Sequence, residues 1–245
     1  MNGKTGSDAT WVPTTLATLA CLAAAMVVAS GFGVRFGVWN YRTGFQILGY
    51  APYVALAIGV LALVAFAAPR WRARGGVLAL AFVVGAVAGL APIMWFRIAR
   101  EGPAINDLTT DTANPPEFRA VVPMRAQSPV PVVYPGDATA ALQREAYPDV
   151  RPAVVAMAPS AAFEAALGAA REMGWQIVAS DAATGRIEAS DTTPWFGFTD
   201  DVVIRVTPDG AGSRIDVRSL SRLGRGDLGA NARRIRRYMA KLAAP

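Results

Sequence analysis

Three uninterrupted apolar runs near the start of the chain constrain its fold more than any other feature. They cover Thr14 to Val34, Phe45 to Ala68 and Gly76 to Phe96, and none of them contains a charged residue. A transmembrane helix needs roughly 20 mostly apolar residues, and each run has that length. Three such runs, joined by short arginine-bearing loops, predict three transmembrane helices in a membrane domain of residues 1–100 and exclude a wholly soluble protein.

The first run has an alternative interpretation as a cleaved signal peptide, because Val28-Ala29-Ser30 resembles a cleavage site. The charge before it is weak, with Lys4 opposed by Asp8, and the run is long, so we favour an uncleaved transmembrane helix. Tryptophan prefers the headgroup level of a bilayer, and it occurs at or near the edges of the runs as Trp11, Trp39, Trp71 and Trp95.

Small residues recur at every fourth position on one face of the third run, at Ala81, Gly85 and Gly89. Such a row lets two helix backbones approach closely in lipid. It predicts packing within the protein's own helix bundle, and a homo-oligomer formed through Gly85 and Gly89 is the alternative.

Charged residues beside the runs indicate how the membrane domain is oriented. Lysines and arginines near the runs number four on each side, so the total count does not decide. The densest cluster is Arg70-Trp71-Arg72-Ala73-Arg74, in a short loop where the bias of positive charge toward the cytoplasm acts most directly. We therefore expect a multi-pass protein of the inner membrane, with the N-terminus and this loop in the cytoplasm and the C-terminal half outside.

The rest of the chain divides into a connector, residues 101–146, and an α+β domain, residues 147–245. Prolines in the connector disfavour regular helix and favour extended structure, although Ile105 and Phe118 can dock on a surface. In the domain, residue patterns predict the order β-α-β-β-β-β-α, with the last helix from Asp227 to Leu242. An antiparallel sheet with both helices on one face satisfies this order, as in helix-grip-like modules. The predicted strands are residues 153–157, 175–180, 186–192, 201–207 and 214–220.

Composition excludes several classes of chemistry. The chain contains no histidine and one cysteine. This excludes triads and metal sites that need imidazole, disulfides within the chain, and cysteine-ligated zinc or iron–sulfur clusters. Ser219 and Ser221 accordingly have no histidine base. We predict no catalytic residue, no metal and no cofactor.

Charge is strongly polarised along the C-terminal half, although the formal net charge of the chain is only +6. Residues 101–212 carry 7 basic and 15 acidic side chains, whereas residues 213–245 carry 9 basic and 2 acidic ones. The basic final helix indicates a site for a membrane surface or acidic partner, or a solvated face that pairs with acidic residues of its own domain. We favour the second interpretation. Nucleic acid is disfavoured as a partner because residues 101–212 would repel phosphate.

One segment, from Arg218 to Asn231, has the composition of an anion site. It leaves a strand, passes through a glycine-rich turn flanked by arginines and enters a helix, whose first backbone N–H groups attract anions. An Asp–Arg ion-pair network that shapes the turn is the favoured alternative, because Asp227 lies where the anion would bind. The candidate ligand-binding residues are Arg218, Ser219, Ser221, Arg222, Arg225, Asp227 and Asn231.

Two adjacent carboxylates, Asp200 and Asp201, are possible acidic partners of these arginines. Successive strand residues point to opposite faces of a sheet, so both can act on one substrate only if a turn continues through them. The alternative function, a hydrolase-like enzyme, would need both carboxylates, Arg222 and Asp227 to share one cleft.

Several stretches of the C-terminal half form a specific combination. They are Ile105 to Asp111, Asn114 to Phe118, Tyr147 to Asp149, Gly174-Trp175, Asp191 to Asp201, Arg218 to Arg222 and Gly226 to Ile235. Together they resemble an uncharacterised family of bacterial membrane proteins, catalogued as domain of unknown function 1499. The resemblance implies a membrane protein with an α+β domain and brings no activity. It also implies that Asp107 to Phe118 docks on the domain.

These observations lead to one expected function and one alternative. We expect a membrane-anchored, non-enzymatic module of the bacterial envelope, held in the lipid bilayer by its helices. Its soluble domain is expected in the periplasm, where it binds a protein partner or an anionic lipid headgroup. The alternative is the hydrolase-like enzyme built on Asp200, Asp201 and the neighbouring turn.

Overall fold

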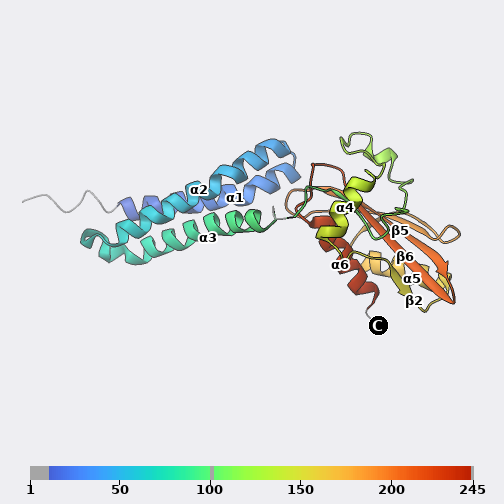
Figure 1. Cartoon of the computed structure of the whole chain (residues 1–245). Coiled ribbons are helices and arrows are strands. Elements are labelled where there is room, and N and C mark those ends of the chain that lie inside the picture. Colours follow the sequence, from blue (N-terminus) through green and yellow to red (C-terminus); the bar gives the residue numbers. More distant parts are fainter. Residues whose placement is uncertain (1–10, 100–101, 244–245) are drawn as a thin grey trace, which may run out of the picture. The chain divides into compact units, whose positions relative to one another are not determined.

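The computed structural model describes residues 11–99 and 102–243, and it divides into two compact units. The helical unit contains the residues up to Ile98 together with Pro194–Gly197, and the soluble unit contains the remainder. Figure 1 shows the elements of both units along the chain. Lys4 and Asp8, on which the signal-peptide argument depends, lie outside the described residues.

The helical unit contains the three predicted helices, α1 (Trp11–Arg35), α2 (Tyr41–Phe66) and α3 (Gly75–Ala99), drawn in blue to green in Figure 1. A short 3-10 helix, η1 (Pro69–Arg74), forms the arginine-bearing loop. By length and composition, all three helices are able to cross a membrane. The prediction of three long apolar helices is therefore confirmed.

Glycines of α3 pack against α2 at very short range. A Cβ atom placed on Gly85 would lie 2.5 Å from the Ala55 carbonyl oxygen, and one on Gly89 would lie 2.8 Å from that of Pro52. Only glycine permits so close an approach of two helix backbones in an apolar medium. The predicted small-residue row thus packs within the bundle, and α2 covers the face on which a homo-oligomer was the alternative.

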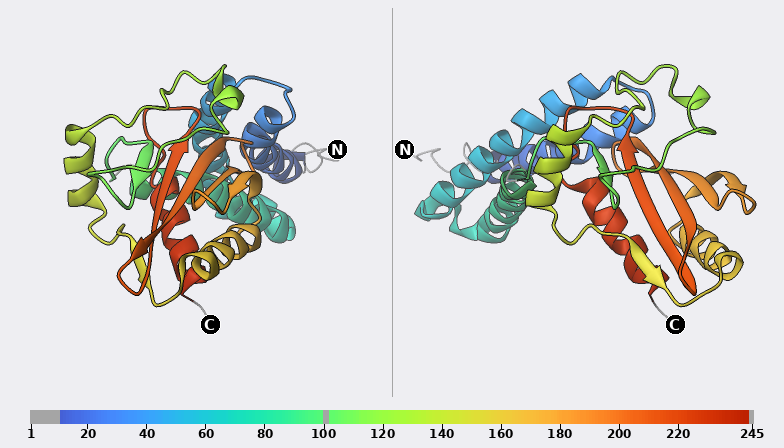
Figure 2. Two further views of the ribbon diagram at one scale, coloured as in Figure 1. Left: turned by 90° about the vertical axis from the view of Figure 1, so that its right-hand side faces the viewer. Right: turned by 45° about the vertical axis from the view of Figure 1, so that its right-hand side comes forward.

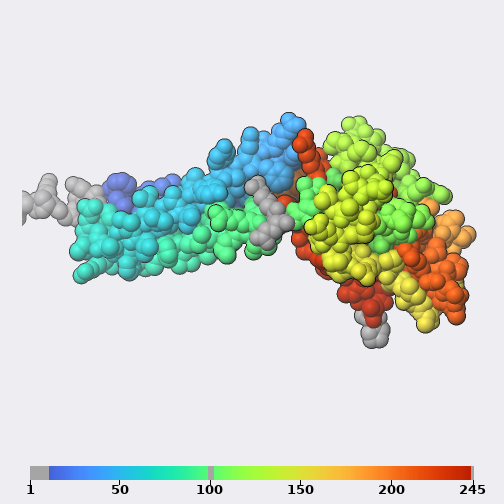
Figure 3. All heavy atoms as spheres, viewed as in Figure 1, coloured from blue at the N-terminus to red at the C-terminus, as the bar shows by residue number. Residues whose placement is uncertain are grey.

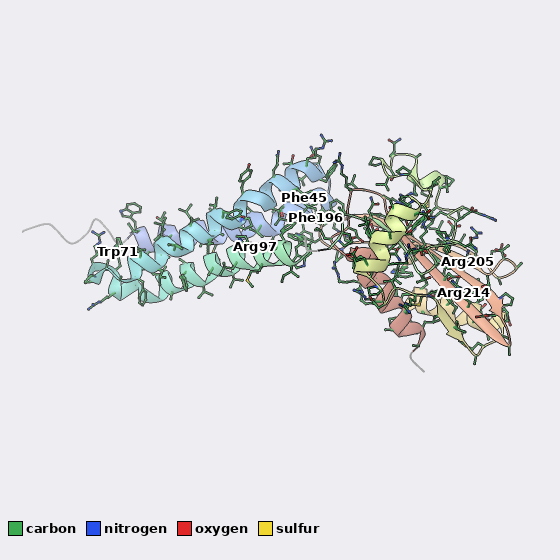
Figure 4. The ribbon with its side chains drawn as sticks, viewed as in Figure 1. Phe45, Trp71, Arg97, Phe196, Arg205 and Arg214 are labelled. Atoms are coloured by element: carbon green, nitrogen blue, oxygen red, sulfur yellow. The ribbon has the colours of Figure 1, made fainter. Side chains whose placement is uncertain are left out.

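The four residues Pro194–Gly197 belong to the helical unit by their contacts. Trp195 Nε1 donates to the Val28 carbonyl oxygen at 2.8 Å. The Phe196 ring stacks on Phe45 with a centroid distance of 5.1 Å, and Figure 4 shows the two labelled side chains together. This short aromatic loop therefore packs on α1 and α2.

The soluble unit is built on a six-stranded antiparallel sheet in the order β1-β6-β5-β4-β3, with β2 also paired to β6. The two longest strands, β5 and β6, lie side by side (Figure 2). The strands are β1 (Asp107–Thr109), β2 (Ala153–Val155), β3 (Gln176–Asp181), β4 (Arg186–Thr192), β5 (Thr199–Asp209) and β6 (Gly212–Ser221). The helices are η2 (Pro123–Arg125), α4 (Asp137–Ala146), α5 (Pro159–Glu172) and α6 (Ala230–Leu242). The predicted α+β fold and its β-α-β-β-β-β-α order are confirmed.

Helices α5 and α6 form the apolar core with one face of the sheet. Strand residues that alternate in the sequence, such as Ile204 and Ile215, meet Phe163 of α5 and Ile235 of α6 in this core. Tyr238 is fully buried and donates its hydroxyl to the Ala166 carbonyl oxygen at 3.0 Å. We call this side of the sheet the helix face.

The opposite side, which we call the connector face, is covered by residues 102–135. Val203 and Leu220 point to this side and pack against Phe118 and Val121 of the connector. In the space-filling view, residues 102–146, green to yellow, form much of the visible face of the soluble unit (Figure 3). The predicted docking of Asp107 to Phe118 is confirmed, since β1 pairs with β6.

Two local predictions need correction. The connector is not extended throughout, because α4 forms after its last proline, Pro135, in a proline-free stretch of good helix formers. The last helix begins at Ala230 and not at Asp227, because Leu228 and Gly229 have positive φ angles of 52° and 75°, which no α-helix accommodates.

Candidate functional site

The segment from Arg218 to Asn231 has the predicted course of strand, glycine-rich turn and helix. Its side chains do not converge, because the end of β6 alternates between the two faces of the sheet. Ser219 and Ser221 contact α6 on the helix face, whereas Arg218 and Arg222 contact connector-face partners. The seven candidate residues therefore do not form one site. Three of them join β6 to α6, Arg218 and Arg222 have partners on the connector face, and Arg225 and Asp227 lie in the turn.

The helix-face network joins the end of β6 to the start of α6. The Asn231 side chain accepts from Ser219 Oγ at 2.7 Å and donates to Ser221 Oγ at 3.1 Å. Arg234 donates to Asn231 Oδ1 at 2.6 Å and pairs with Asp200 at 2.6 Å. All five side chains are buried. They hydrogen-bond one another and so fix α6 on the sheet, which leaves them little capacity for a ligand.

Asp201 is the centre of the connector-face network. Its carboxylate pairs with Arg125 at 2.6 Å and Arg222 at 2.7 Å, and it accepts from Ser190 Oγ at 2.7 Å. Burial by itself would raise the pKa of Asp201, but hydrogen bonds from Arg222, Ser190 and Arg125 outweigh it and hold the pKa below its ordinary value. The carboxylate therefore stays ionised as a structural anchor for two arginines.

The two adjacent carboxylates point to opposite faces of the sheet. Asp200 pairs with Arg234 of α6, and Asp201 pairs with Arg125 and Arg222 on the connector face. Strand β5 runs through both residues without a turn. The sheet lies between them, so they do not share the cleft that the hydrolase-like alternative needs. The predicted pairing of one carboxylate with an arginine of the turn is confirmed by Asp201 and Arg222.

The guanidinium of Arg218 makes its polar contacts with the connector. It donates to both oxygens of Asp107, at 2.9 and 2.7 Å, and lies 5.0 and 5.4 Å from the ring centroids of Phe118 and Tyr134. Burial raises the pKa of Asp107 even though Arg218 donates to it. Such a buried, bidentate pair is a clamp that binds the connector to the sheet.

Asp227 occupies the place that a bound anion would take at the start of α6. Its carboxylate accepts from the backbone N–H groups of Gly229 at 2.8 Å and Asn231 at 2.6 Å. Burial raises the pKa of Asp227, while these hydrogen bonds oppose the shift. The favoured prediction is an Asp–Arg ion-pair network that shapes the turn. Asp227 instead shapes the turn through backbone hydrogen bonds, and the Asp–Arg pair at this end of β6 is that of Arg222 with Asp201.

Most cations of the basic helix also have partners within the soluble unit. Arg236 pairs with Asp149, with one donor–acceptor distance of 2.7 Å, and Lys241 pairs with Glu172 at 3.0 Å. Arg234 is buried with its two aspartates, Asp191 and Asp200. The favoured interpretation, pairing with acidic residues of the same domain, is confirmed for these three.

An open groove of about 490 Å³ lies between the connector and the turn after β6. Its walls contain three prolines of the connector, together with Val133, Tyr134 and Arg225. Val133 is 75% exposed, and Arg225 is exposed with no ion pair among the described residues. We call this feature the proline-lined groove, and its remaining lining residues are Asn106, Asp107, Pro129, Val130, Pro131, Pro135, Leu220 and Gly224.

Tyr134 contributes an unsatisfied polar atom beside this groove. Its hydroxyl is buried and has no hydrogen-bond partner in the described part of the chain. Burial and the nearby Asp107 raise the pKa of the hydroxyl to about 12, so it remains a proton donor at neutral pH.

Several important polar residues were not among the sequence candidates. Glu188, fully buried, accepts from the backbone N–H groups of Arg119 and Val121 at 2.9 to 3.1 Å. Arg125 lies alone in a proline-rich stretch, with nothing in the sequence to relate it to Asp201. For Asp107, the sequence offers one signal of burial: its charged side chain comes directly before the apolar residue Leu108. Over the described residues, no group of acidic side chains or cysteine is arranged to hold a metal ion.

Comparison with known families covers most of the soluble unit. The model of the family described as "Protein of unknown function (DUF1499)" matches residues 107–242, which is more than half of the chain. Neither the curated proteins nor the solved structures provided a match. The matched range runs from β1 to the end of α6, so it includes the docked connector as well as the sheet and helices. The chain therefore belongs to the DUF1499 family of proteins of unknown function.

Proposed function

We propose that this protein is a membrane-anchored binding module without enzymatic activity, and that its soluble unit holds a segment of a partner protein in the proline-lined groove. The observation that carries the proposal is the groove itself, because it is open, of ligand size and lined by both apolar and polar groups.

The chemistry of the groove favours an extended polypeptide with an acidic residue. Proline and valine walls offer apolar contact, and proline backbone cannot donate hydrogen bonds. Arg225 is an exposed cation that suits a carboxylate. Tyr134 also lines the groove, with its hydroxyl buried. Arginine and tyrosine are also among the residues that most often dominate binding energy at protein interfaces.

An anionic lipid headgroup is the weaker of the two expected ligands. Three of the cations on α6, Arg234, Arg236 and Lys241, already pair with carboxylates. Ion pairs of this kind offset the positive charge that would attract a lipid surface. A hydrolase-like enzyme is weaker still, because its two carboxylates lie on opposite faces of the sheet.

Placement in the membrane is part of the proposal. We infer that the N-terminus and η1 face the cytoplasm and that the soluble unit lies in the periplasm, because η1 contains Arg70, Arg72 and Arg74 in one short loop. Reporter fusions after Phe96 and at the C-terminus test this. A periplasmic signal from both supports the assignment, and a cytoplasmic signal overturns it.

Photo-crosslinking from the groove tests the binding function. A photoreactive residue replaces Val133, which is exposed, in the full-length protein in its native membranes. We expect an adduct of one discrete mass. Arg225→Glu should abolish it by repelling the acidic partner, whereas Arg237→Glu, on the exposed side of α6, should leave it intact.

Two outcomes would contradict this function. An adduct that is equally strong with Arg225→Glu would show that the groove does not select the partner. Adducts with lipid alone would favour the headgroup interpretation.

A further inference from the structure

A second hollow lies on the connector face and shares no lining residue with the proline-lined groove. It has a volume of about 210 Å³, several times the roughly 30 Å³ that one water occupies in the liquid. Asn114 to Glu117 form one wall, and Arg186, Val203 and Arg205 of the sheet form the other.

Two arginines stand directly opposite each other in this hollow. The antiparallel register of β4 and β5 pairs Arg186 with Arg205. Directly opposed like charges destabilise a sheet. Both side chains are also largely buried, with 20% and 22% of their surface exposed, so water screens their repulsion only in part.

The donors of these arginines are not used up by the protein. Arg205 makes its contacts through Nη2, which donates to Asp111, Asp216 and the Asn114 carbonyl oxygen at 3.0 to 3.1 Å. Its Nε is buried and has no hydrogen-bond partner anywhere in the described residues. Arg186 donates from Nη1 to the Glu117 carbonyl oxygen at 2.7 Å, and the carboxylate of Glu188 is 3.9 Å away.

The charges around the hollow leave Arg186 incompletely neutralised, whereas Arg205 pairs with Asp111 and Asp216. Burial lowers the pKa of Arg186, and Arg119 and Arg205 lower it further, against Glu188 and Glu117. Glu188 is already used to accept backbone N–H groups of the connector. Glu117 is exposed and is the one carboxylate that lines the hollow.

We propose that this hollow is a binding site for one small oxyanion, a phosphate or a carboxylate, held between Arg186 and Arg205. A guanidinium is suited to both because its planar donors match two oxygens of one group. The ligand would supply an acceptor for donors of Arg186, which makes a single hydrogen bond within the described residues, through Nη1, and would place negative charge between the two opposed cations. The site goes beyond the proposed function, since it differs from the groove in location and chemistry.

The thermal stability of the full-length protein in neutral lipid nanodiscs tests the site. Unfolding is followed at increasing inorganic phosphate, and in a second arm acetate, each against sodium chloride at the same ionic strength. A ligand that binds only the folded state raises the unfolding temperature in a saturable way. We expect saturation with at least one of the two anions and none with chloride.

Three variants locate the site. Arg186→Gln should weaken binding about tenfold or more, as expected for loss of a charge-assisted hydrogen bond. Arg237→Gln is the matched control and should bind as the wild type does. Glu117→Gln removes the competing carboxylate and should tighten binding roughly two- to fivefold.

Two results would overturn the proposal. The first is an identical response of the wild type to phosphate, acetate and chloride. The second is an Arg186→Gln protein that binds as tightly as the wild type. If Arg186→Gln does not fold, unchanged affinity in Glu117→Gln overturns the proposal as well, because that variant changes only an exposed side chain.

Discussion

The two faces of one sheet are held by different forces. On the helix face, α5 and α6 bury regular apolar stripes, and one polar network at the end of β6 fixes α6 in register. On the connector face, the covering segment has little regular structure and only a small apolar cluster around Phe118 and Val121. Charged side chains of the sheet supply the remaining contacts there.

These charged side chains add to the few backbone hydrogen bonds that the irregular segment makes with itself, such as that from the Met124 N–H to the Val121 carbonyl oxygen. Glu188 accepts two connector N–H groups, and Arg218 donates to the carbonyl oxygens of Pro116 and Val132. Arg205 does the same for Asn114. Arg125 acts in the opposite direction: it is a connector side chain that donates to the carbonyl oxygens of Leu220 and Ser221 in the sheet strand β6.

This contrast between the two faces explains how a proline-rich stretch can belong to a folded unit. Buried backbone groups must be paired, and regular elements pair their own. A segment interrupted by prolines pairs only some of its own groups, so the sheet provides ionised partners for others. Hydrogen bonds to ionised groups are stronger than neutral ones.

Arg218→Ala should have the largest effect on the connector face. It leaves Asp107 as an unpaired buried carboxylate and removes the donor for Pro116 and Val132. Breaking a buried pair by removing one partner costs about 3–5 kcal/mol. Chemical unfolding of the full chain, followed by tryptophan fluorescence to which buried Trp175 of the soluble unit contributes, measures the change in the free energy of unfolding.

A double variant distinguishes a clamp from simple packing. Asp107→Leu combined with Arg218→Met removes both charges and should be less destabilised than Arg218→Ala alone. If the double variant is as unstable as the single one, the ion pair is not what holds the connector.

Asp201→Asn should have the second largest effect and a distinct pH dependence. It removes the carboxylate shared by Arg125 and Arg222, at a cost of about 1.5–3 kcal/mol for charge-assisted hydrogen bonds. The pKa of Asp201 is lower in the folded protein than its value of about 3.8 in the unfolded chain. The contribution of the ionised carboxylate to stability is therefore complete above the unfolded pKa and is lost as the pH falls through the folded pKa. Unfolding free energies measured from pH 3 to 6 should therefore converge for variant and wild type at the acid end. A constant difference across this range would contradict the assignment.

Glu188→Gln should loosen the connector locally. The amide keeps one acceptor oxygen, so we expect a loss of about 1 kcal/mol, the usual net value of one hydrogen bond. Amide hydrogen exchange should quicken at Arg119 and Val121, whose N–H groups Glu188 accepts. Ile235→Val on the helix face costs a similar amount, about 0.5–1.5 kcal/mol, and serves as control. Ile235→Val should quicken amide exchange in α6 and leave amide exchange in the connector unchanged. If both variants quicken exchange in the connector equally, the two faces are not held by different forces.

The two faces also differ in how far the sequence predicts them. Period-two alternation around Ile204 and Ile215 and the helical stripe through Ile235 identify the helix face, since each pattern is local. The opposite orientations of Asp200 and Asp201 follow from the same alternation. The clamp between Asp107 and Arg218 joins residues 111 positions apart, and no local pattern relates them. The predicted start of α6 is too early because Leu228 adopts a positive φ that its residue type does not favour.

The smallest effect should come from Asp149→Asn, which breaks the exposed pair with Arg236. About half of each side chain is exposed, at 53% and 44%, so water already screens the attraction. Exposed ion pairs contribute about 0.5 kcal/mol or less to the free energy of unfolding. The Asp149–Arg236 pair nevertheless has the same contact geometry as the Asp107–Arg218 pair, since each has two short hydrogen bonds. Raising the salt concentration should abolish even this small contribution, whereas it should leave the effect of Arg218→Ala nearly unchanged. If Asp149→Asn is as destabilising as Arg218→Ala, burial is not what makes the connector-face ion pairs strong, because contact geometry is the property that the two pairs share.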